Sequence, residues 1–205
     1  MKKEIYGTRG YVEALEKFTK ATLSIDFFEL HQDFIQFIPK KPGSILDIGA
    51  GIGRDAAVFS EMGHSVTAVE PLQEFRTLGK ELFPDSTIEW LDDSLPELTT
   101  LKNSDILFDF VLASGIWHHL APEEQYLSIS KIASLTAPNG IFALTLRNGP
   151  AGVGSHIYDT NGEKTIRHAE QLGFKTLMFL ENQPSLIKGK ENVMWSKLVF
   201  QKQPS

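Results

Sequence analysis

Residues 46–56 read LDIGAGIGRDA, and this stretch decides the fold. An apolar run ends in three alternating glycines, Gly49, Gly51 and Gly53, and a helical pattern begins at Arg54. A strand, a glycine-rich turn and a helix in this order place bare backbone N–H groups at the carboxyl edge of a parallel sheet, where α/β folds bind ligands. Glycine is required where φ is positive or where a side chain would block the ligand. The stretch therefore predicts a ligand-binding strand–turn–helix unit.

The rest of the chain repeats this alternation of strand and helix. Seven apolar segments are typical of strands: 44–49, 65–70, 87–91, 108–114, 140–146, 175–181 and 194–202. Four helical patterns lie between them, at 54–62, 72–83, 122–136 and 162–173. The last two strands have no helix between them, so we expect a hairpin there. The pattern predicts an α/β three-layer sandwich with a mostly parallel seven-stranded sheet and one antiparallel strand.

The first forty residues follow a different pattern. Two apolar faces at helical spacing indicate two helices: Val12, Leu15, Phe18, Thr19 and Thr22 for the first, and Phe27, Leu30, Phe34 and Ile38 for the second. Pro39 and Pro42 separate them from the first strand. We expect one domain over residues 1–205, with 1–40 as a helical cap on a core formed by 41–205.

Composition narrows the class of partner. The chain has 205 residues, a net charge of −6 and no cysteine, which excludes disulfides and thiolate metal sites. The sequence contains no block of Lys and Arg of the kind that indicates nucleic-acid binding. No apolar run approaches the roughly 20 residues that span a bilayer, and the start of the chain lacks the apolar part of a secretion signal. We expect a cytoplasmic protein with a small-molecule partner, no nucleic acid, no membrane and no metal; the oligomeric state is not indicated.

The glycine pattern does not fit a dinucleotide. The G-x-G-x-x-G fingerprint, counted from Gly49, requires a third glycine where Arg54 stands. An arginine there would obstruct the close approach of a pyrophosphate. This position disfavours a nicotinamide-dependent oxidoreductase.

Acidic residues follow three successive strands. Asp47 precedes the first glycine, where a carboxylate suits an ammonium; Glu70 ends the second strand and can accept both hydroxyls of a ribose. Asp92 and Asp93 follow the third strand, where a carboxylate can accept from an adenine amino group. Taken singly, Glu70 is also compatible with a solvated strand end and the aspartate pair with a helix cap. Together they suit a ligand with an ammonium, a ribose and an adenine but no phosphate, which is S-adenosylmethionine.

Five stretches between residues 44 and 146 resemble the class I S-adenosylmethionine-dependent methyltransferases: ILDIGAGIGRDA, VTAVEP, LDDSLPEL, FDFVLASGIWHHL and TAPNGIFALTL. The segment YVEALEKFTKATLSIDF, together with GRD, is similar to the small bacterial type that includes tellurite-resistance-like proteins. The resemblance implies a Rossmann-like fold, a methyltransferase activity, S-adenosyl-L-methionine as cofactor and S-adenosyl-L-homocysteine as product.

The resemblance also implies a set of cofactor contacts. The glycines Gly49, Gly51 and Gly53 would back the methionine moiety, with Asp47 near its ammonium and Glu70 on the ribose. Around the adenine we expect Asp92 or Asp93, Ser94 and Leu95. The expected contacts are completed by Tyr11, Ala50, Arg54, Pro71, Leu72, Ala113 and Ser114. Two alternatives stay open for Arg54, which either reaches the methionine carboxylate or pairs with Asp55 or Glu61.

The methyl acceptor is expected beside the loop SGIWHHLAP, residues 114–122. His118 is a candidate general base, although methyl transfer from an activated donor needs mainly positioning. Trp117 either walls the acceptor pocket or packs under the next helix. Arg147 and Asn148, at the end of the fifth strand, are placed to bind an acidic substrate group; for Arg147 a structural salt bridge is the alternative.

Two covering elements complete the acceptor site. Tyr6 in the cap is expected to close over the ligands and contact the substrate. The glycine-rich loop 149–160 is a candidate lid.

The sequence as a whole predicts an S-adenosylmethionine-dependent methyltransferase that acts on a small molecule. Two alternatives remain: a catalytically idle module that binds S-adenosylmethionine or S-adenosylhomocysteine, and a methyltransferase that acts on protein or nucleic acid. The net charge and the absence of an NPPY-like turn after the fourth strand weaken the nucleic-acid alternative.

Overall fold

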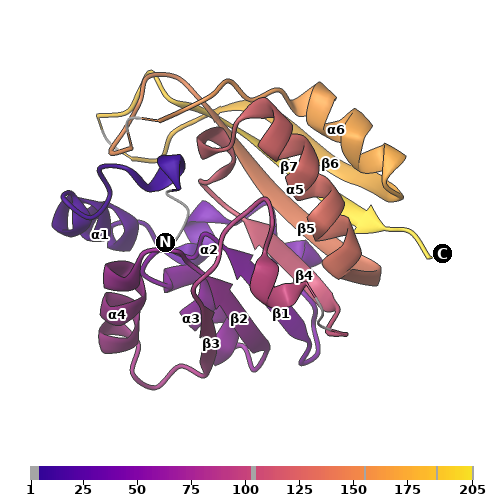
Figure 1. Ribbon diagram of the computed structural model, residues 1–205, viewed down its shortest axis with the longest axis horizontal. Coiled ribbons are helices and arrows are strands. Elements are labelled where there is room, and N and C mark those ends of the chain that lie inside the picture. Colours follow the sequence, from indigo (N-terminus) through magenta and orange to yellow (C-terminus); the bar gives the residue numbers. More distant parts are fainter. Residues whose placement is uncertain (1–4, 103–104, 155, 188, 205) are drawn as a thin grey trace.

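A computed structural model describes residues 5–102, 105–154, 156–187 and 189–204. The described strands form a mixed sheet in the order β3-β2-β1-β4-β5-β7-β6 (Figure 1). Their bounds are β1 Ser44–Ile48, β2 Ser65–Val69, β3 Ile88–Leu91, β4 Phe108–Ala113, β5 Thr136–Asn148, β6 Phe174–Pro184 and β7 Met194–Lys202. Strand β7 runs antiparallel to both of its neighbours, β5 and β6. The predicted Rossmann-like α/β fold with one antiparallel strand is confirmed.

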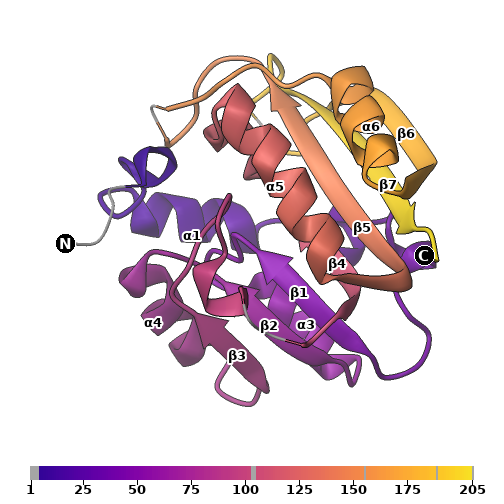
Figure 2. The same cartoon turned by 45° about the vertical axis from the view of Figure 1, so that its right-hand side comes forward.

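Helices cover both faces of the sheet, which is why its strands are apolar on both sides. Helices α5 (Pro122–Leu135) and α6 (Gly162–Gln171) lie on one face, in front of the sheet in Figure 2. On the other face, α3 (Arg54–Glu61) packs the ring of Phe59 5.7 Å from that of Phe110 on β4. Helix α4 (Gln73–Leu82) connects β2 to β3. No helix in the described ranges is long and apolar enough to cross a membrane.

The N-terminal segment, residues 5–38, holds one firmly buried part and one surface part. Its elements are η1 (Tyr6–Thr8), α1 (Leu15–Leu23), α2 (Phe27–Leu30) and η2 (Ile35–Phe37). Phe27 and Phe34 belong to the core beneath α3, and Asp33 forms an ion pair of 2.7 Å with Lys197 on β7. Helix α1 buries none of its residues completely. The segment is therefore anchored at its second half, while α1 reaches over the carboxyl ends of the strands.

The structure departs from the expected elements in two places. Strand β5 begins at Thr136, because Thr136 already pairs with Phe108 of β4. The expected second helix of the cap is broken into α2 and η2. Helix α2 ends at His31, whose ring binds the Asp55 carboxylate of α3 at 2.8 Å instead of continuing the apolar face.

Candidate active site

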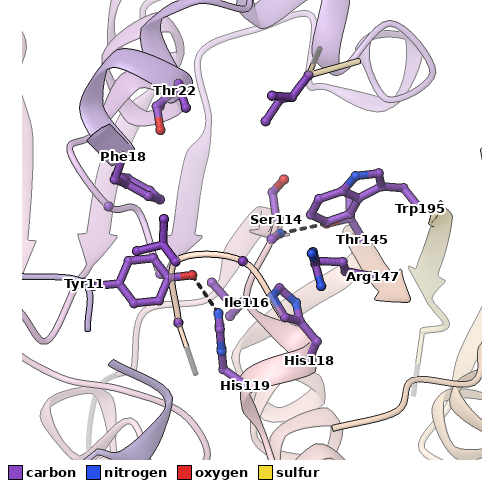
Figure 3. A pocket seen from close by; sticks show the side chains of 18 of the residues that line it. Tyr11, Phe18, Thr22, Ser114, Ile116, His118, His119, Thr145, Arg147 and Trp195 are labelled. Atoms are coloured by element: carbon purple, nitrogen blue, oxygen red, sulfur yellow. Dashed lines mark hydrogen bonds between the residues drawn. The ribbon is translucent and has the colours of Figure 1, made fainter. Parts of the chain in front are cut away.

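A cavity of about 1010 Å³ lies at the carboxyl ends of β1, β2, β4 and β5. Ligands of open α/β sheets bind at this edge. Cavities for single drug-sized ligands measure about 300–1,000 Å³, so this one has room for two small molecules. Figure 3 shows the N-terminal residues Tyr11 and Phe18 on one side of the cavity and Arg147 and Trp195 on the other.

The glycine loop between β1 and α3 is tied to the end of β2. The amides of Gly49 and Ala50 donate to the carbonyl of Val69 at 2.8 and 3.0 Å. Gly51 has a φ of 58°, and a Cβ added to it would come 3.3 Å from the ring of Phe18. The loop thus needs glycine at Gly51 for its conformation and for the close approach of the N-terminal segment.

Glu70 lies where the sequence predicts it, lining the cavity at the end of β2. Its Oε2 accepts from the amide of Gly51 at 3.0 Å and its Oε1 from that of Leu72 at 2.9 Å. Burial raises the pKa of Glu70 to about 7 in spite of these two donors. Each carboxylate oxygen can accept a second hydrogen bond, so the group fits the two hydroxyls of a ribose.

Asp47 is the clearest fit for a cationic group. Only 3% of the residue is exposed, and its Oδ2 has no hydrogen-bond partner among the described atoms. Burial and the negative charge of Asp55 raise the pKa of Asp47 well above its ordinary value. A buried carboxylate oxygen without a partner is costly, and an ammonium bound in the cavity would relieve that cost.

Arg54 takes the second of its two predicted alternatives, although it also lines the cavity. Its Nε donates to Asp55 Oδ1 at 2.7 Å, and its Nη1 donates to the Thr22 carbonyl at 2.8 Å. Burial alone would raise the pKa of Asp55, but the charges of His31 and Arg54 hold it far below its ordinary range. This cluster joins the glycine loop to the N-terminal segment, so positioning of the loop is the role that the contacts support.

The two aspartates predicted near the adenine are both engaged by the protein. Asp92 forms an ion pair of 3.1 Å with Arg76 and is not among the cavity residues. Asp93 lines the cavity, but its Oδ2 accepts from the amide of Thr100 at 2.7 Å; residues 95–97, where a helix capped by the aspartate pair was the alternative, form a turn instead. Ser94 and Leu95 line the cavity beside it.

Three predicted residues lie behind the cavity wall rather than in it. Gly53 begins α3 and faces the ring of Trp90, and Ala113 is buried inside β4. Trp117 is fully buried in the core, with its ring 6.2 Å from that of Phe142. Trp117, on η4 (Trp117–His119), therefore takes the second of its two alternatives and packs under the next helix; its placement in the acceptor pocket is wrong, because the large apolar ring is buried among core residues of α5 and β5.

Ser114 and His118 face the cavity as predicted. Burial lowers the pKa of His118 to about 2, helped by the positive charges of Arg147 and Lys190. Its Nδ1 is buried without a partner among the described atoms. His118 is therefore a neutral imidazole at physiological pH, and a weaker base than the sequence suggests.

The neighbouring His119 is the residue that the predicted site set omits. Its Nδ1 lies 2.7 Å from the carbonyl of His156, so Nδ1 carries the proton. Burial lowers the pKa of His119, so the ring is neutral and its Nε2 accepts from the hydroxyl of Tyr11 at 2.8 Å (Figure 3). These two hydrogen bonds, which we call the Tyr11 relay, join the N-terminal segment, η4 and the carbonyl of His156 beside the cavity. In the sequence, only the position of His119 next to His118 pointed to this role.

Arg147 lines the cavity as predicted, whereas Asn148 and Tyr6 do not. The Asn148 Oδ1 accepts from the hydroxyl of Thr160 at 3.0 Å. Tyr6 is 54% exposed and stacks on His156 with the ring centroids 5.5 Å apart. Both residues therefore hold the covering loop instead of contacting the cavity.

The β6–β7 turn and the start of β7 supply lining residues that the sequence did not indicate, among them Lys190 and Asn192 of the turn and Trp195 of β7. Strand β6 is parallel to β1, β2, β4 and β5, so its carboxyl end reaches the same edge of the sheet. These lining residues could have been expected from this strand topology.

Comparisons with known proteins agree with this geometry. Residues 46–144 match the family model described as a methyltransferase domain. An uncharacterized methyltransferase of Bacillus cytotoxicus is 27% identical over an alignment of 162 positions, and one of Bacillus mycoides is 28% identical over 155; each alignment covers 74% of this chain. The chain spans 66%, just under two thirds, of the length of these relatives.

Solved structures show the same fold. The N-methyltransferase NodS of Bradyrhizobium japonicum, in complex with S-adenosyl-L-homocysteine, has a TM-score of 0.74 at 13% identity, covering 97% of this chain and 100% of that one. The 1,6-didemethyltoxoflavin-N1-methyltransferase of Burkholderia thailandensis has a TM-score of 0.70 at 19% identity, with 95% and 86% covered. A TehB-like methyltransferase of Corynebacterium glutamicum has a TM-score of 0.68 at 19% identity, with 94% and 97% covered.

These findings confirm the predicted class. Residues 46–144 match a methyltransferase domain, and the chain shares the fold of S-adenosylmethionine-dependent methyltransferases. The predicted cofactor, S-adenosylmethionine, is the one that this class uses. Asp47 and Glu70 fit its ammonium and its ribose.

Proposed function

We propose that this chain transfers the methyl group of S-adenosylmethionine to a small-molecule acceptor. One observation carries the proposal: a single cavity of about 1010 Å³ reaches from the glycine loop to Arg147. The walls of the cavity include α1, residues 150–154 and the residues 185–187 and 189–193 between β6 and β7. Walls of this kind favour a small acceptor over a protein or a nucleic acid, which would need open access.

One end of the cavity holds the methyl donor and the other end holds the acceptor. At the β1–β2 end, Asp47 binds the ammonium of the donor and Glu70 orients its ribose, while Ala50, Pro71, Leu72 and Leu95 line the wall. When bound, S-adenosylmethionine supplies an electrophilic methyl group on its sulfonium, so the protein needs chiefly to align the acceptor with it. At the β4–β5 end, Ser114 and the neutral His118 lie where an acceptor would be held.

A labelling screen tests the proposal. The purified chain is incubated with S-adenosylmethionine carrying a radioactive methyl group and, separately, with a metabolite mixture, denatured proteins, and RNA and DNA. The label is expected in the small-molecule fraction, with an equal amount of S-adenosylhomocysteine released. Label in protein or nucleic acid alone contradicts the proposal, as does tight binding of S-adenosylhomocysteine with no transfer in any fraction, which would identify an idle binding module.

A further inference from the structure

The acceptor end of the cavity contains a buried and incompletely paired guanidinium. Arg147 is only 6% exposed and projects from the end of β5 into the cavity (Figure 3). Its Nη2 donates to the carbonyl of Pro150 at 2.6 Å, and its Nη1 is buried with no partner among the described atoms. A buried charge without a counter-charge is unfavourable. The arrangement therefore calls for an anion supplied from outside the described protein.

None of the acidic residues that line the cavity forms an ion pair with Arg147. Asp55 is paired with His31 and Arg54, and Asp33 is paired with Lys197. Asp93 accepts from the backbone of its own turn. Within the described ranges, no carboxylate lies at ion-pair distance from Arg147, so the alternative of a structural salt bridge is not what these residues form.

Further positive charge gathers at the same end. Lys190 of the β6–β7 turn and Lys17 of α1 both line the cavity. Burial, Arg147 and Lys17 each lower the pKa of Lys190. The flanking His118 and His119 are neutral and bring no negative charge. Glu191, next to Lys190, also lines the cavity; its Oε1 accepts from the amide of Gly189 at 3.0 Å, and within the described ranges no ion pair joins it to these cations. The three like charges repel one another, and a bound anion would reverse that repulsion.

We propose that the methyl acceptor carries an anionic group, a carboxylate or a phosphate, which binds the free edge of the Arg147 guanidinium beside Lys190. The planar fork of an arginine matches such groups with two parallel hydrogen bonds. The rest of the acceptor lies against Trp195, whose ring stands edge-on to that of His118 with centroids 6.2 Å apart. This inference rests on the proposed function, since it names the substrate class of the same cavity.

The test measures binding and does not depend on turnover. Three probes share an aromatic body and differ in charge: phenylacetate, phenyl phosphate and the neutral phenylacetamide. Each is titrated calorimetrically into the full chain, with and without saturating S-adenosylhomocysteine. At least one anionic probe is expected to bind ten or more times more tightly than the amide in both conditions, and the two anions distinguish a carboxylate from a phosphate site.

Two variants test whether Arg147 causes the preference for an anion. In Arg147→Met the preference for an anion is expected to fall to within twofold of the amide, while S-adenosylhomocysteine affinity stays unchanged. The matched control is Arg167→Met, because Arg167 is 65% exposed on α6 and contacts Glu163 at 3.8 Å; it should keep the preference. The melting temperature of Arg147→Met is expected to equal or exceed that of the wild type, because a buried unpaired charge is removed.

Three results overturn the inference. They are equal binding of anions and amide, no binding of any probe, and an anion preference that survives in Arg147→Met. Loss of anion binding on addition of S-adenosylhomocysteine also overturns it, because the anion at Arg147 would then be the carboxylate of the donor itself. Failure of S-adenosylhomocysteine to bind would instead count against the proposed function, and the arm without it would still decide the present inference.

Discussion

The two ends of the cavity have opposite charge. At the β1–β2 end, Asp47 and Glu70 are buried carboxylates whose pKa values are raised, first of all by burial. At the β4–β5 end, Arg147 and Lys190 are cations whose pKa values burial lowers. Each end is unfavourable while it lacks a partner, and each favours a ligand group of the opposite sign. The contrast supports a cationic donor at one end and an anionic acceptor at the other.

The largest effect is expected from Asp47→Asn. Losing a charge-assisted contact to the ammonium should weaken S-adenosylhomocysteine binding by about 1.5–3 kcal/mol, or roughly 10- to 150-fold. The same change should raise the free energy of unfolding of the ligand-free chain by about 1 kcal/mol or more, because a buried negative charge whose Oδ2 has no partner among the described atoms is removed. Calorimetry and urea unfolding measure the two quantities.

Asp85→Asn is the matched control, since Asp85 is exposed. It should leave both quantities unchanged. If Asp47→Asn neither weakened S-adenosylhomocysteine binding nor raised the free energy of unfolding, the acidic end would not be the donor site.

Glu70→Gln tests the acidic end of the cavity through the pH dependence of stability. Burial raises the pKa of Glu70 from 4.5 to about 7 in the folded chain. Between these values the folded state holds a proton that the unfolded state has released, so stability falls as pH rises and levels off above about 7. The free energy of unfolding of the wild type, relative to Glu70→Gln, should fall by up to about 3 kcal/mol across this range.

Ligand binding should follow the opposite course. Ribose hydroxyls donate to the ionised carboxylate, so S-adenosylhomocysteine affinity of the wild type should rise with pH through about 7, and that rise should vanish in Glu70→Gln. An affinity that does not change with pH in either protein would remove Glu70 from the ribose.

His118→Ala tests whether the basic end also supplies a base. Since the pKa of His118 is lowered to about 2, its ring is neutral throughout pH 5–9 and should add no inflection to the profile of kcat. We expect kcat to fall less than about tenfold, because general bases contribute roughly 10²–10⁴. His168→Ala on α6 serves as the control, and a loss of a hundredfold specific to His118 would make it the base.

The smallest effect is expected from Tyr11→Phe, which tests the cover above both ends. The variant removes the hydroxyl that donates to His119 Nε2 at 2.8 Å. The free energy of unfolding should fall by about 1 kcal/mol. Tyr126→Phe on α5, where the tyrosine is 47% exposed, should change it little; equal losses in the two variants would mean that the Tyr11 relay does not hold the cover.

The donor end was predictable from sequence and the acceptor end only in part. The glycine loop, Asp47 and Glu70 all sit directly after buried strands, and local periodicity places strand ends. By contrast, Lys190 enters the cavity through the topology of the β6–β7 turn, and Lys17 through the path of α1, which no local pattern encodes. The two alternatives for Trp117 stayed open for a related reason: the sequence marks an aromatic residue beside the site but not the direction in which η4 points its side chain.

The most direct test of the divided cavity is a crystal structure of the chain with S-adenosylhomocysteine. We expect the ligand ammonium on the Asp47 carboxylate, the ribose hydroxyls on Glu70, and the ligand sulfur directed toward the space between Ser114, His118 and Arg147. A ligand turned the other way, with its own carboxylate on the guanidinium of Arg147, would contradict it.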